Sequence, residues 1–193
     1  VVVLQDGQEL WRRRLSARSL TPPLVAGERV FVYAQDRSVH AFDADTGSRL
    51  WVQQRQGDPL TLSQQGVLLP VGDTLIVGQG PRLVALDPLR GAVRWEVPVA
   101  NPRGTNEVER LADLVGPAGR QADTVCVRAF QAAVGCVDTR RARLLWSKGS
   151  NGAAGVATDV GQAYGVDSTS RITAYRLSDG ETLWTADTLR FRG

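Results

Sequence analysis

Few side chains in this sequence of 193 residues could carry chemistry. His40 is the only histidine; it alternates with Val39 and Ala41 and has no Cys or His at metal-ligand spacing. That setting is typical of a structural histidine, not of a metal ligand or a general base. The sequence also lacks a Ser-His-Asp or Cys-His pairing, an H-E-x-x-H motif and a phosphate-binding glycine loop. We therefore expect no enzyme: no catalytic residue, no metal site and no cofactor.

The two cysteines could form a disulfide bond. Cys126 and Cys136 flank the segment 129–134, which we expect to connect two antiparallel strands. A two-residue turn at Gln131-Ala132 would face Cys126 toward Val137 and place the two thiols on opposite faces of the sheet. A turn that differs by one residue would make the cysteines direct partners. We expect the first register, with two buried thiols. The second register would allow a disulfide, which an oxidising compartment would permit.

Three aspartates, Asp43, Asp87 and Asp138, could suggest metal carboxylates, but they occupy one position of a repeat. The repeat is complete in residues 41–51 (AFDADTGSRLW), and weaker copies lie at 85–95, 136–146, 174–184 and 1–11. One position in separate structural units favours an aspartate that accepts hydrogen bonds from the turn that follows it.

The last position of each copy is a tryptophan, and these are all five tryptophans of the chain: Trp11, Trp51, Trp95, Trp146 and Trp184. The intervals between them are 40, 44, 51 and 38 residues. Periods near 40 residues are found in helical solenoids and in four-stranded propeller blades. Short β-branched or aromatic runs separated by Gly, Asp and Pro turns exclude the helical option.

We therefore predict an all-β fold, a β-propeller of four-stranded antiparallel blades. Residues 1–193 form a single partial propeller of roughly four to five blades, out of eight in a whole ring, with repeat units that end near the tryptophans. Each indole should pack on the adjacent blade, where a buried aromatic covers roughly 150–250 Å². Where a copy has a glycine, at Gly7, Gly47, Gly91 and Gly180, that residue should supply a positive φ in the turn.

The net charge of +3 is mild, because 23 basic residues are interspersed with 20 acidic ones. A nucleic-acid partner is therefore not expected. The one basic run, Arg12-Arg13-Arg14, favours a solvated strand face over a contact with a polyanion or a lipid headgroup. No apolar stretch approaches the length of a membrane span. The chain begins inside a repeat, without an initiator Met, signal peptide or lipid-attachment cysteine. We expect a portion of a longer protein, whose arc closes with the remaining blades or with a second copy.

Two connections between blades stand out as places for binding residues. The connection 53–65 holds Leu60 and Leu62 on one side of an extended segment, as either a partner surface or plugs between blades. The insertion 101–117 explains the longest interval and is densely charged. Asn106 and Glu109 could cap one helical turn in it. A solvated excursion anchored by Leu111 is the alternative to a binding loop.

The motif A-x-D-x-x-T-G-x-x-x-W resembles the tryptophan-docking motif of pyrroloquinoline-quinone (PQQ) type propellers. Two groups share that motif, the quinoprotein dehydrogenases and the BamB family of outer-membrane β-barrel assembly lipoproteins. Residues 105–114 (TNEVERLADL) are similar to the S-T-E-I-D-R-L-S-D segment of the BamB family. Residues 60–63 (LTLS) stand at the offset from their tryptophan of the family's S-L-S-L-R segment. The sequence departs from the family at Ser63, where the family has Arg, and at Val115, where it has Asp.

The resemblance implies a non-enzymatic scaffold on the periplasmic face of the outer membrane, anchored by a lipid that lies outside this chain. It implies binding to the periplasmic POTRA repeats of BamA, near the third repeat, within a machine of further components. The implied partner-binding residues are Leu60, Leu62, Ser63, Glu107, Glu109, Arg110 and Asp113.

Two alternatives remain open: a fragment of a quinoprotein dehydrogenase and a generic protein-interaction propeller. Quinoprotein chemistry needs PQQ held between a tryptophan and a disulfide of adjacent cysteines, with Glu, Asn and Asp on Ca²⁺. The cysteines here are ten residues apart.

Overall fold

The computed structural model describes residues 1–55, 62–101 and 111–187. Every regular element in these ranges is a β-strand. The strands form one two-stranded and four four-stranded antiparallel sheets. Within each sheet, consecutive strands are neighbours, so every sheet is a meander. The predicted all-β fold with four-stranded blades is confirmed. No helix with the length and hydropathy of a membrane span occurs among the described residues.

We number the sheets as blades in chain order. Blade 1 is the pair β1 (Val2–Gln5) and β2 (Gln8–Arg12). Blade 2 comprises β3 (Leu24–Ala26), β4 (Arg29–Tyr33), β5 (Val39–Asp43) and β6 (Arg49–Gln53). Blade 3 comprises β7 (Leu68–Val71), β8 (Thr74–Gln79), β9 (Arg82–Leu86) and β10 (Val93–Pro98). Blade 4 comprises β11 (Leu114–Gln121), β12 (Thr124–Ala129), β13 (Ala133–Asp138) and β14 (Arg143–Gly149). Blade 5 comprises β15 (Val156–Asp159), β16 (Gln162–Val166), β17 (Ile172–Arg176) and β18 (Thr182–Ala186).

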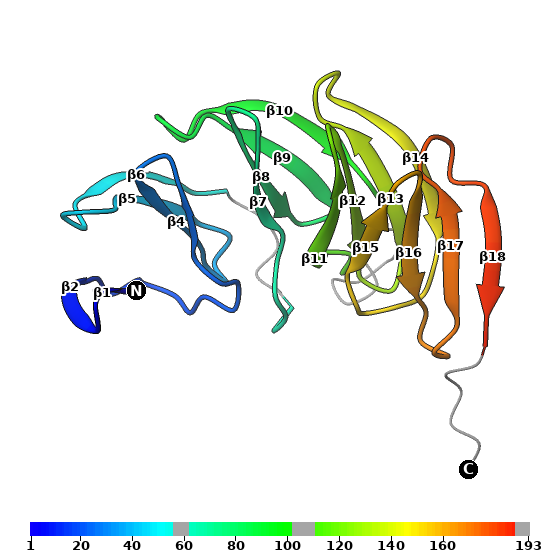
Figure 1. The fold of residues 1–193 in the computed structure, drawn as a ribbon, viewed down its shortest axis with the longest axis horizontal. Coiled ribbons are helices and arrows are strands. Elements are labelled where there is room, and N and C mark those ends of the chain that lie inside the picture. The colour runs from blue at the N-terminus through cyan, green and yellow to red at the C-terminus, as the bar shows by residue number, and fades with distance from the viewer. Residues whose placement is uncertain (56–61, 102–110, 188–193) are drawn as a thin grey trace, which may run out of the picture.

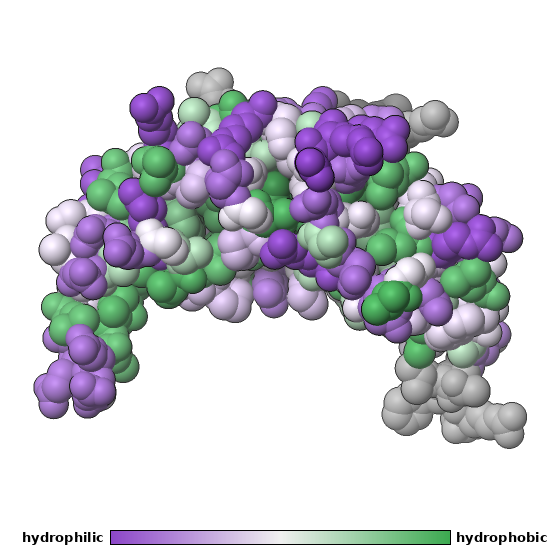
Figure 2. Space-filling model, turned by 45° about the horizontal axis from the view of Figure 1, so that its top comes forward, coloured by the Kyte–Doolittle hydropathy of each residue, from purple (hydrophilic) through white to green (hydrophobic). Residues whose placement is uncertain are grey.

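The blades stand side by side along an open arc, with β1–β2 at one end and β18 at the other (Figure 1). The space-filling view shows the same arch, with polar and apolar side chains interspersed over the face in view (Figure 2). The buried apolar clusters lie between neighbouring blades: one joins blades 1 and 2, one blades 2 and 3, one blades 3 and 4, and one blades 4 and 5. The hydrophobic effect therefore holds each blade to the next.

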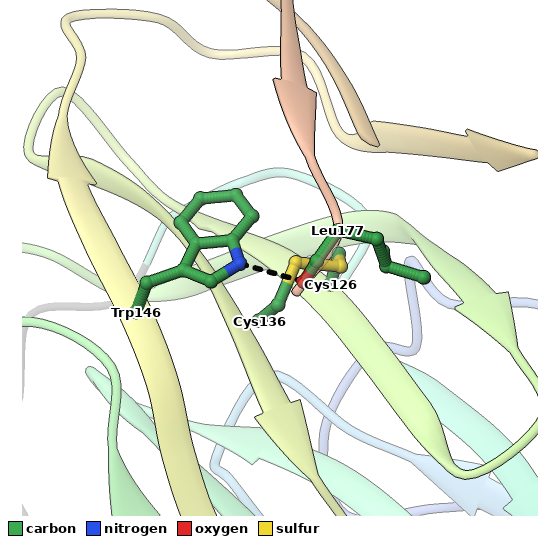
Figure 3. The surroundings of a disulfide bond; sticks show 4 residues. All are labelled: Cys126, Cys136, Trp146 and Leu177. Carbon is green, nitrogen blue, oxygen red and sulfur yellow. Dashed lines mark hydrogen bonds between the residues drawn. A yellow bond between two sulfur atoms is a disulfide. The ribbon is translucent and has the colours of Figure 1, made fainter. Parts of the chain in front are cut away.

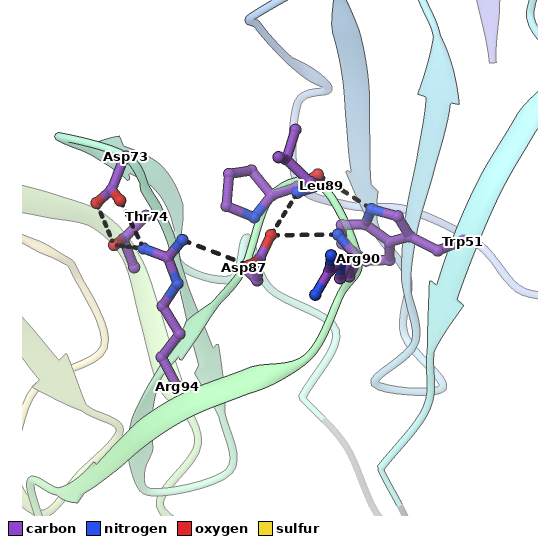
Figure 4. A network of polar contacts seen from close by, with 8 residues as sticks. Trp51, Asp73, Thr74, Asp87, Leu89, Arg90 and Arg94 are labelled. Atoms are coloured by element: carbon purple, nitrogen blue, oxygen red, sulfur yellow. Dashed lines mark hydrogen bonds and ion pairs between the residues drawn. The ribbon is translucent and has the colours of Figure 1, made fainter.

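The repeated aspartates bond to the turns, as predicted. Asp43 Oδ1 accepts the backbone N–H groups of Asp45 and Thr46 at 3.1 and 2.8 Å. Asp87 Oδ1 accepts those of Leu89 and Arg90 at 2.8 and 3.2 Å (Figure 4). The Thr46 amide is the main cause that lowers the pKa of Asp43, since it stabilises the carboxylate.

Three tryptophans dock on the turn of the next blade. Their indole Nε1 groups donate to backbone carbonyls of that turn: Trp11 to Ala44 at 2.8 Å, Trp51 to Pro88 at 3.0 Å and Trp146 to Leu177 at 2.8 Å. Figure 4 shows Trp51 reaching the turn of blade 3. Each ring also covers the turn's glycine, so closely that an added Cβ at Gly47, Gly91 or Gly180 would lie 2.4–2.5 Å from a ring atom.

Trp95 and Trp184 do not complete this contact. In blade 4 the glycine position is taken by Ala142, at φ 52°, and within the described residues the Trp95 indole donates no hydrogen bond. Trp95 is half-buried against the cluster between blades 3 and 4. Trp184 is 44% exposed and packs on Tyr164 of its own blade, because no described blade follows it.

Replacing Ala142 by Gly should therefore stabilise the protein. A non-glycine residue in the left-handed region strains the folded state by roughly 1–2 kcal/mol, and glycine removes this strain. Glycine also raises the entropy of the unfolded chain, which offsets part of the gain. Removal of the methyl group also opens the turn to the Trp95 ring. We expect a gain of about 1 kcal/mol, measured by urea unfolding. Ala122→Gly, at φ 51° in an exposed turn of the same blade, is the control. Equal gains in both variants would show that Trp95 plays no part.

The preference for two buried thiols was wrong. The turn between β12 and β13 has three residues, 130–132, with Gln131 at φ 54°, so Ala129 pairs with Ala133 and Cys126 with Cys136. The side chains then share one face of the sheet and form a disulfide bond, which is fully buried and lies close to Trp146 (Figure 3).

The insertion is shorter than the predicted loop 101–117. Its last four residues already belong to strand β11, which begins at Leu114 and pairs with β12. The predicted helical turn at Asn106 lies outside the described residues.

Candidate functional site

Three of the predicted partner-binding residues lie in the described chain. Leu62 is half-buried, Ser63 is exposed and Asp113 is partly buried. The other four, Leu60, Glu107, Glu109 and Arg110, lie outside the described residues. The geometry of the site therefore rests on residues 62–67 and 111–116.

These two segments lie side by side at one end of the blades. Gly66 forms an antiparallel β-bridge with Val115, and the Gly116 N–H donates to the Gln65 carbonyl at 2.8 Å. The Gly66 N–H donates to Thr21 Oγ1 at 2.9 Å, which adds the connection between blades 1 and 2. Connections distant in sequence are thus joined by backbone hydrogen bonds. Sequence offsets had located both segments but not their contact.

Asp113 links the two connections through its side chain. Its Oδ1 accepts from Arg37 Nη2 at 3.2 Å, and its Oδ2 accepts from the backbone N–H of Leu62 at 3.4 Å. The side chains of Arg37 and Asp113 are only 12% and 17% exposed. Leu62, Arg37 and Asp113 all line a small cavity of about 40 Å³. We call Arg37, Asp113 and the Leu62 amide the clamp.

Arg37 comes from the turn between β4 and β5 and is held there by its backbone. Its N–H donates to the Ala34 carbonyl at 3.0 Å, and its carbonyl accepts from Gln79 Nε2 at 3.1 Å. Gln79 is buried and also donates to Gln53 Oε1 at 2.8 Å, so it ties blade 2 to blade 3. The sequence did not indicate a role for Arg37 or Gln79 at the site. The available signal was a charged residue inside predicted turn residues, which is weak.

Tyr33 lines the same cavity beside the clamp. Burial raises the pKa of its phenol, and the nearby charge of Asp113 raises it further, so Tyr33 is neutral at physiological pH. On the other side, Gln35 Nε2 donates to Ser63 Oγ at 3.4 Å. The tip of the β4–β5 hairpin therefore contacts the connection 62–67 through Gln35.

A second ion pair fixes the start of the same connection. Arg55 donates from Nη1 and Nη2 to the two carboxylate oxygens of Glu96 on β10, at 2.5 and 3.0 Å. This bidentate contact is the main cause that lowers the pKa of Glu96. The described residues on both sides of positions 56–61 are thus bonded to neighbouring blades.

In the basic run near the N-terminus, Arg12 and Arg13 point in different directions, as the alternation of side chains along a strand predicts. Arg12 is exposed and pairs with Glu9 at 2.8 Å, as expected for a solvated face. Arg13 instead donates from Nε to the Gly47 carbonyl at 2.7 Å and lies over the Trp11 ring. It therefore supports the docking of Trp11 on blade 2, a role that the sequence did not indicate.

His40 lies in the core of blade 2. Its Nε2 is 2.8 Å from Ser38 Oγ, and its ring stacks on Phe42. Burial is the main cause that lowers its pKa, because it disfavours the imidazolium. Among the described residues, no group of three or more His, Cys, Asp and Glu side chains could hold a metal ion.

Comparison with known proteins places this geometry in context. A family model described as outer membrane protein assembly factor BamB matches residues 1–186. The BamB of Burkholderia pseudomallei is 34% identical over 189 residues, which is 97% of this chain and 50% of that protein. The BamB of Bordetella pertussis is 33% identical over 195 residues, or 100% of this chain and 50% of that protein. The chain thus spans about half the length of these curated relatives.

Solved structures show the same fold. The crystal structure of BamB from Moraxella catarrhalis matches with a TM-score of 0.86 at 22% identity, over 97% of this chain and 57% of that one. A quinohemoprotein alcohol dehydrogenase from Comamonas testosteroni matches with a TM-score of 0.70 at 17% identity, over 88% of this chain and 35% of that one. At these identities the likeness establishes the propeller fold alone.

Proposed function

Because this chain belongs to the family of the outer membrane protein assembly factor BamB, we propose that it is a non-enzymatic scaffold in the assembly of outer-membrane β-barrel proteins. A scaffold acts by holding binding residues in fixed positions. Blades joined by buried apolar clusters and docked indoles suit that task.

We propose that the partner is the periplasmic POTRA region of BamA. The observation that carries this proposal is the junction of the two connections, where residues 65–66 are bonded to residues 115–116. The junction joins the described ends of two loops that each resemble a segment of the BamB family, which supports a single binding surface. The proposed binding residues are Leu60, Leu62, Ser63, Glu107, Glu109, Arg110 and Asp113. Apolar anchors would supply most of the affinity, with the charged residues around them.

The proposed location is the periplasmic face of the outer membrane, with other assembly components as further partners. The buried Cys126–Cys136 disulfide supports a compartment in which such bonds form and persist.

A quinoprotein dehydrogenase is the competing function suggested by the shared fold. Its cofactor platform is a disulfide of adjacent cysteines exposed to the PQQ ring. Here the disulfide joins two strands of one blade and is covered on all sides, so it cannot serve as that platform.

The test is the double variant Leu60→Glu/Leu62→Glu in a pull-down with purified BamA POTRA repeats. We expect co-purification to be lost, because two charges replace the proposed apolar anchors. Leu89→Glu/Val160→Glu, at residues 61% and 85% exposed in other turns, is the matched control and should bind normally. Thermal unfolding must show that both variants fold. Unchanged binding by the first variant would exclude this surface, and saturable PQQ binding in a parallel titration would support the enzyme.

A further inference from the structure

We infer that Arg37 is a positioning residue of the partner surface: through Asp113 it fixes the two connections in a single arrangement. This inference rests on the proposed function, since it assigns the residue that prepares the surface for its partner. Arg37 belongs to neither connection, and it lies 76 residues before Asp113 in the chain.

Each carboxylate oxygen of Asp113 accepts a hydrogen bond from a different segment. Oδ1 accepts from the guanidinium of Arg37 in blade 2, and Oδ2 accepts from the amide of Leu62 in the connection to blade 3. Asp113 itself stands directly before β11, and its carbonyl accepts the Phe130 N–H of blade 4 at 3.0 Å. Asp113 therefore joins blade 2, the connection to blade 3 and blade 4, and Arg37 fixes the orientation of its carboxylate.

The ion pair of Arg37 and Asp113 is largely shielded from solvent. Exposed ion pairs contribute about 0–1 kcal/mol, because solvent and salt screen them. Arg37 and Asp113 are 12% and 17% exposed, so their attraction is screened less. Removal of the guanidinium would leave a partly buried carboxylate with one amide donor. The carboxylate would then turn toward water and release the Leu62 amide.

The backbone of Arg37, from which its side chain extends, is held in place. The Arg37 backbone is bonded on one side to Ala34 and on the other to the buried Gln79. Because the backbone of Arg37 is fixed, the positions that its guanidinium can occupy are restricted. In the absence of a partner both oxygens of Asp113 are engaged within the chain. Besides its proposed contact with the partner, Asp113 therefore sets the spacing of the two connections, as preorganised binding sites require.

The experiment uses Arg37→Met, which keeps the length of the side chain and removes its charge. The direct readout is hydrogen exchange of the Leu62 amide, followed by NMR without any partner. We expect exchange to become at least about tenfold faster, because the amide loses an acceptor that is held in place. Binding to the POTRA repeats should weaken about tenfold. Arg37→Lys should restore part of both, since it returns the charge without the planar donor group.

Two further variants make the test specific. Asp113→Asn should speed Leu62 exchange as Arg37→Met does, and the double variant should add little, because both changes break one unit. Arg171→Met removes an exposed ion pair with Asp187 in blade 5 and should change neither readout.

The outcomes separate the two proposals. If Leu62 exchange in Arg37→Met equals that in Arg171→Met, the positioning role is excluded. Faster exchange with unchanged POTRA binding would exclude it as well. If the wild-type chain does not bind the POTRA repeats, the proposed partner is wrong, and Leu62 exchange alone then decides whether Arg37 holds the connections.

Discussion

Replacement of Gly91 by alanine should lower the free energy of unfolding by about 3 kcal/mol. Gly91 has φ 72°, a conformation that costs an L-residue roughly 1–2 kcal/mol. Its Cβ would also lie 2.5 Å from Cε3 of Trp51, and overpacking of this kind typically costs 1–3 kcal/mol. The Trp51 ring would have to leave the turn and give up its hydrogen bond to the Pro88 carbonyl. Urea unfolding followed by tryptophan fluorescence measures the loss.

Gly72→Ala separates the two contributions. Gly72 has φ 57° in a turn of the same blade, and an added Cβ there would meet no atom within 4 Å. This control should lose only the backbone contribution of roughly 1–2 kcal/mol. The difference between the variants then measures the contact between indole and turn. Equal losses would mean that docked tryptophans do not hold neighbouring blades together.

The fold could be predicted because its signals are local. The Asp, Gly and Trp positions of the repeat lie within ten residues of its first position, and most residues at these positions act on a turn or on the adjoining blade. Trp95 packs against the cluster between blades 3 and 4, as predicted, but it lacks the indole hydrogen bond where one residue of the turn has changed. With Ala142 at the glycine position the turn carries a methyl group, and Trp95 does not make the bond seen at Trp51.

The candidate site could be predicted only in part, because its key contacts are between blades. Offsets from the tryptophans located Leu62 and Asp113, and the resemblance gave them a role. Arg37 meets Asp113 only because the curvature of the arc brings a hairpin of blade 2 to the connection before blade 4. No local pattern encodes that approach.

The prediction for the two cysteines was wrong for a different physical reason, the period of two along a strand. A turn of three residues instead of two moves every side chain of β13 to the other face relative to β12. Sequence offsets cannot fix turn length to one residue. Register predictions across a turn of unknown length therefore remain ambiguous even where both strands are correctly placed.

The variant Cys126→Ala/Cys136→Ala should lower the free energy of unfolding by about 4 kcal/mol. A cross-link that closes a loop of this size contributes roughly 2–3 kcal/mol by restricting the unfolded chain, and the loss of two buried sulfur atoms adds to this. Urea unfolding with and without reductant provides the measurement. Wild type should become less stable once reductant has cleaved the bond in the unfolded state, and the variant should not respond. A variant as stable as wild type would show that the bond adds nothing.

The other blades provide a control for packing. Where blade 4 has Cys126 opposite Cys136, blades 2, 3 and 5 have a large residue opposite an alanine: Phe31 and Ala41, Ile76 and Ala85, Tyr164 and Ala174. The small residue in turn faces the tryptophan of the outer strand, as Cys136 faces Trp146. Cys126→Ile/Cys136→Ala should therefore recover about 1–2 kcal/mol of the loss, because it restores buried apolar volume without the cross-link. If it recovers nothing, the disulfide acts through the covalent bond alone. If it recovers everything, the bond contributes only as a buried apolar pair.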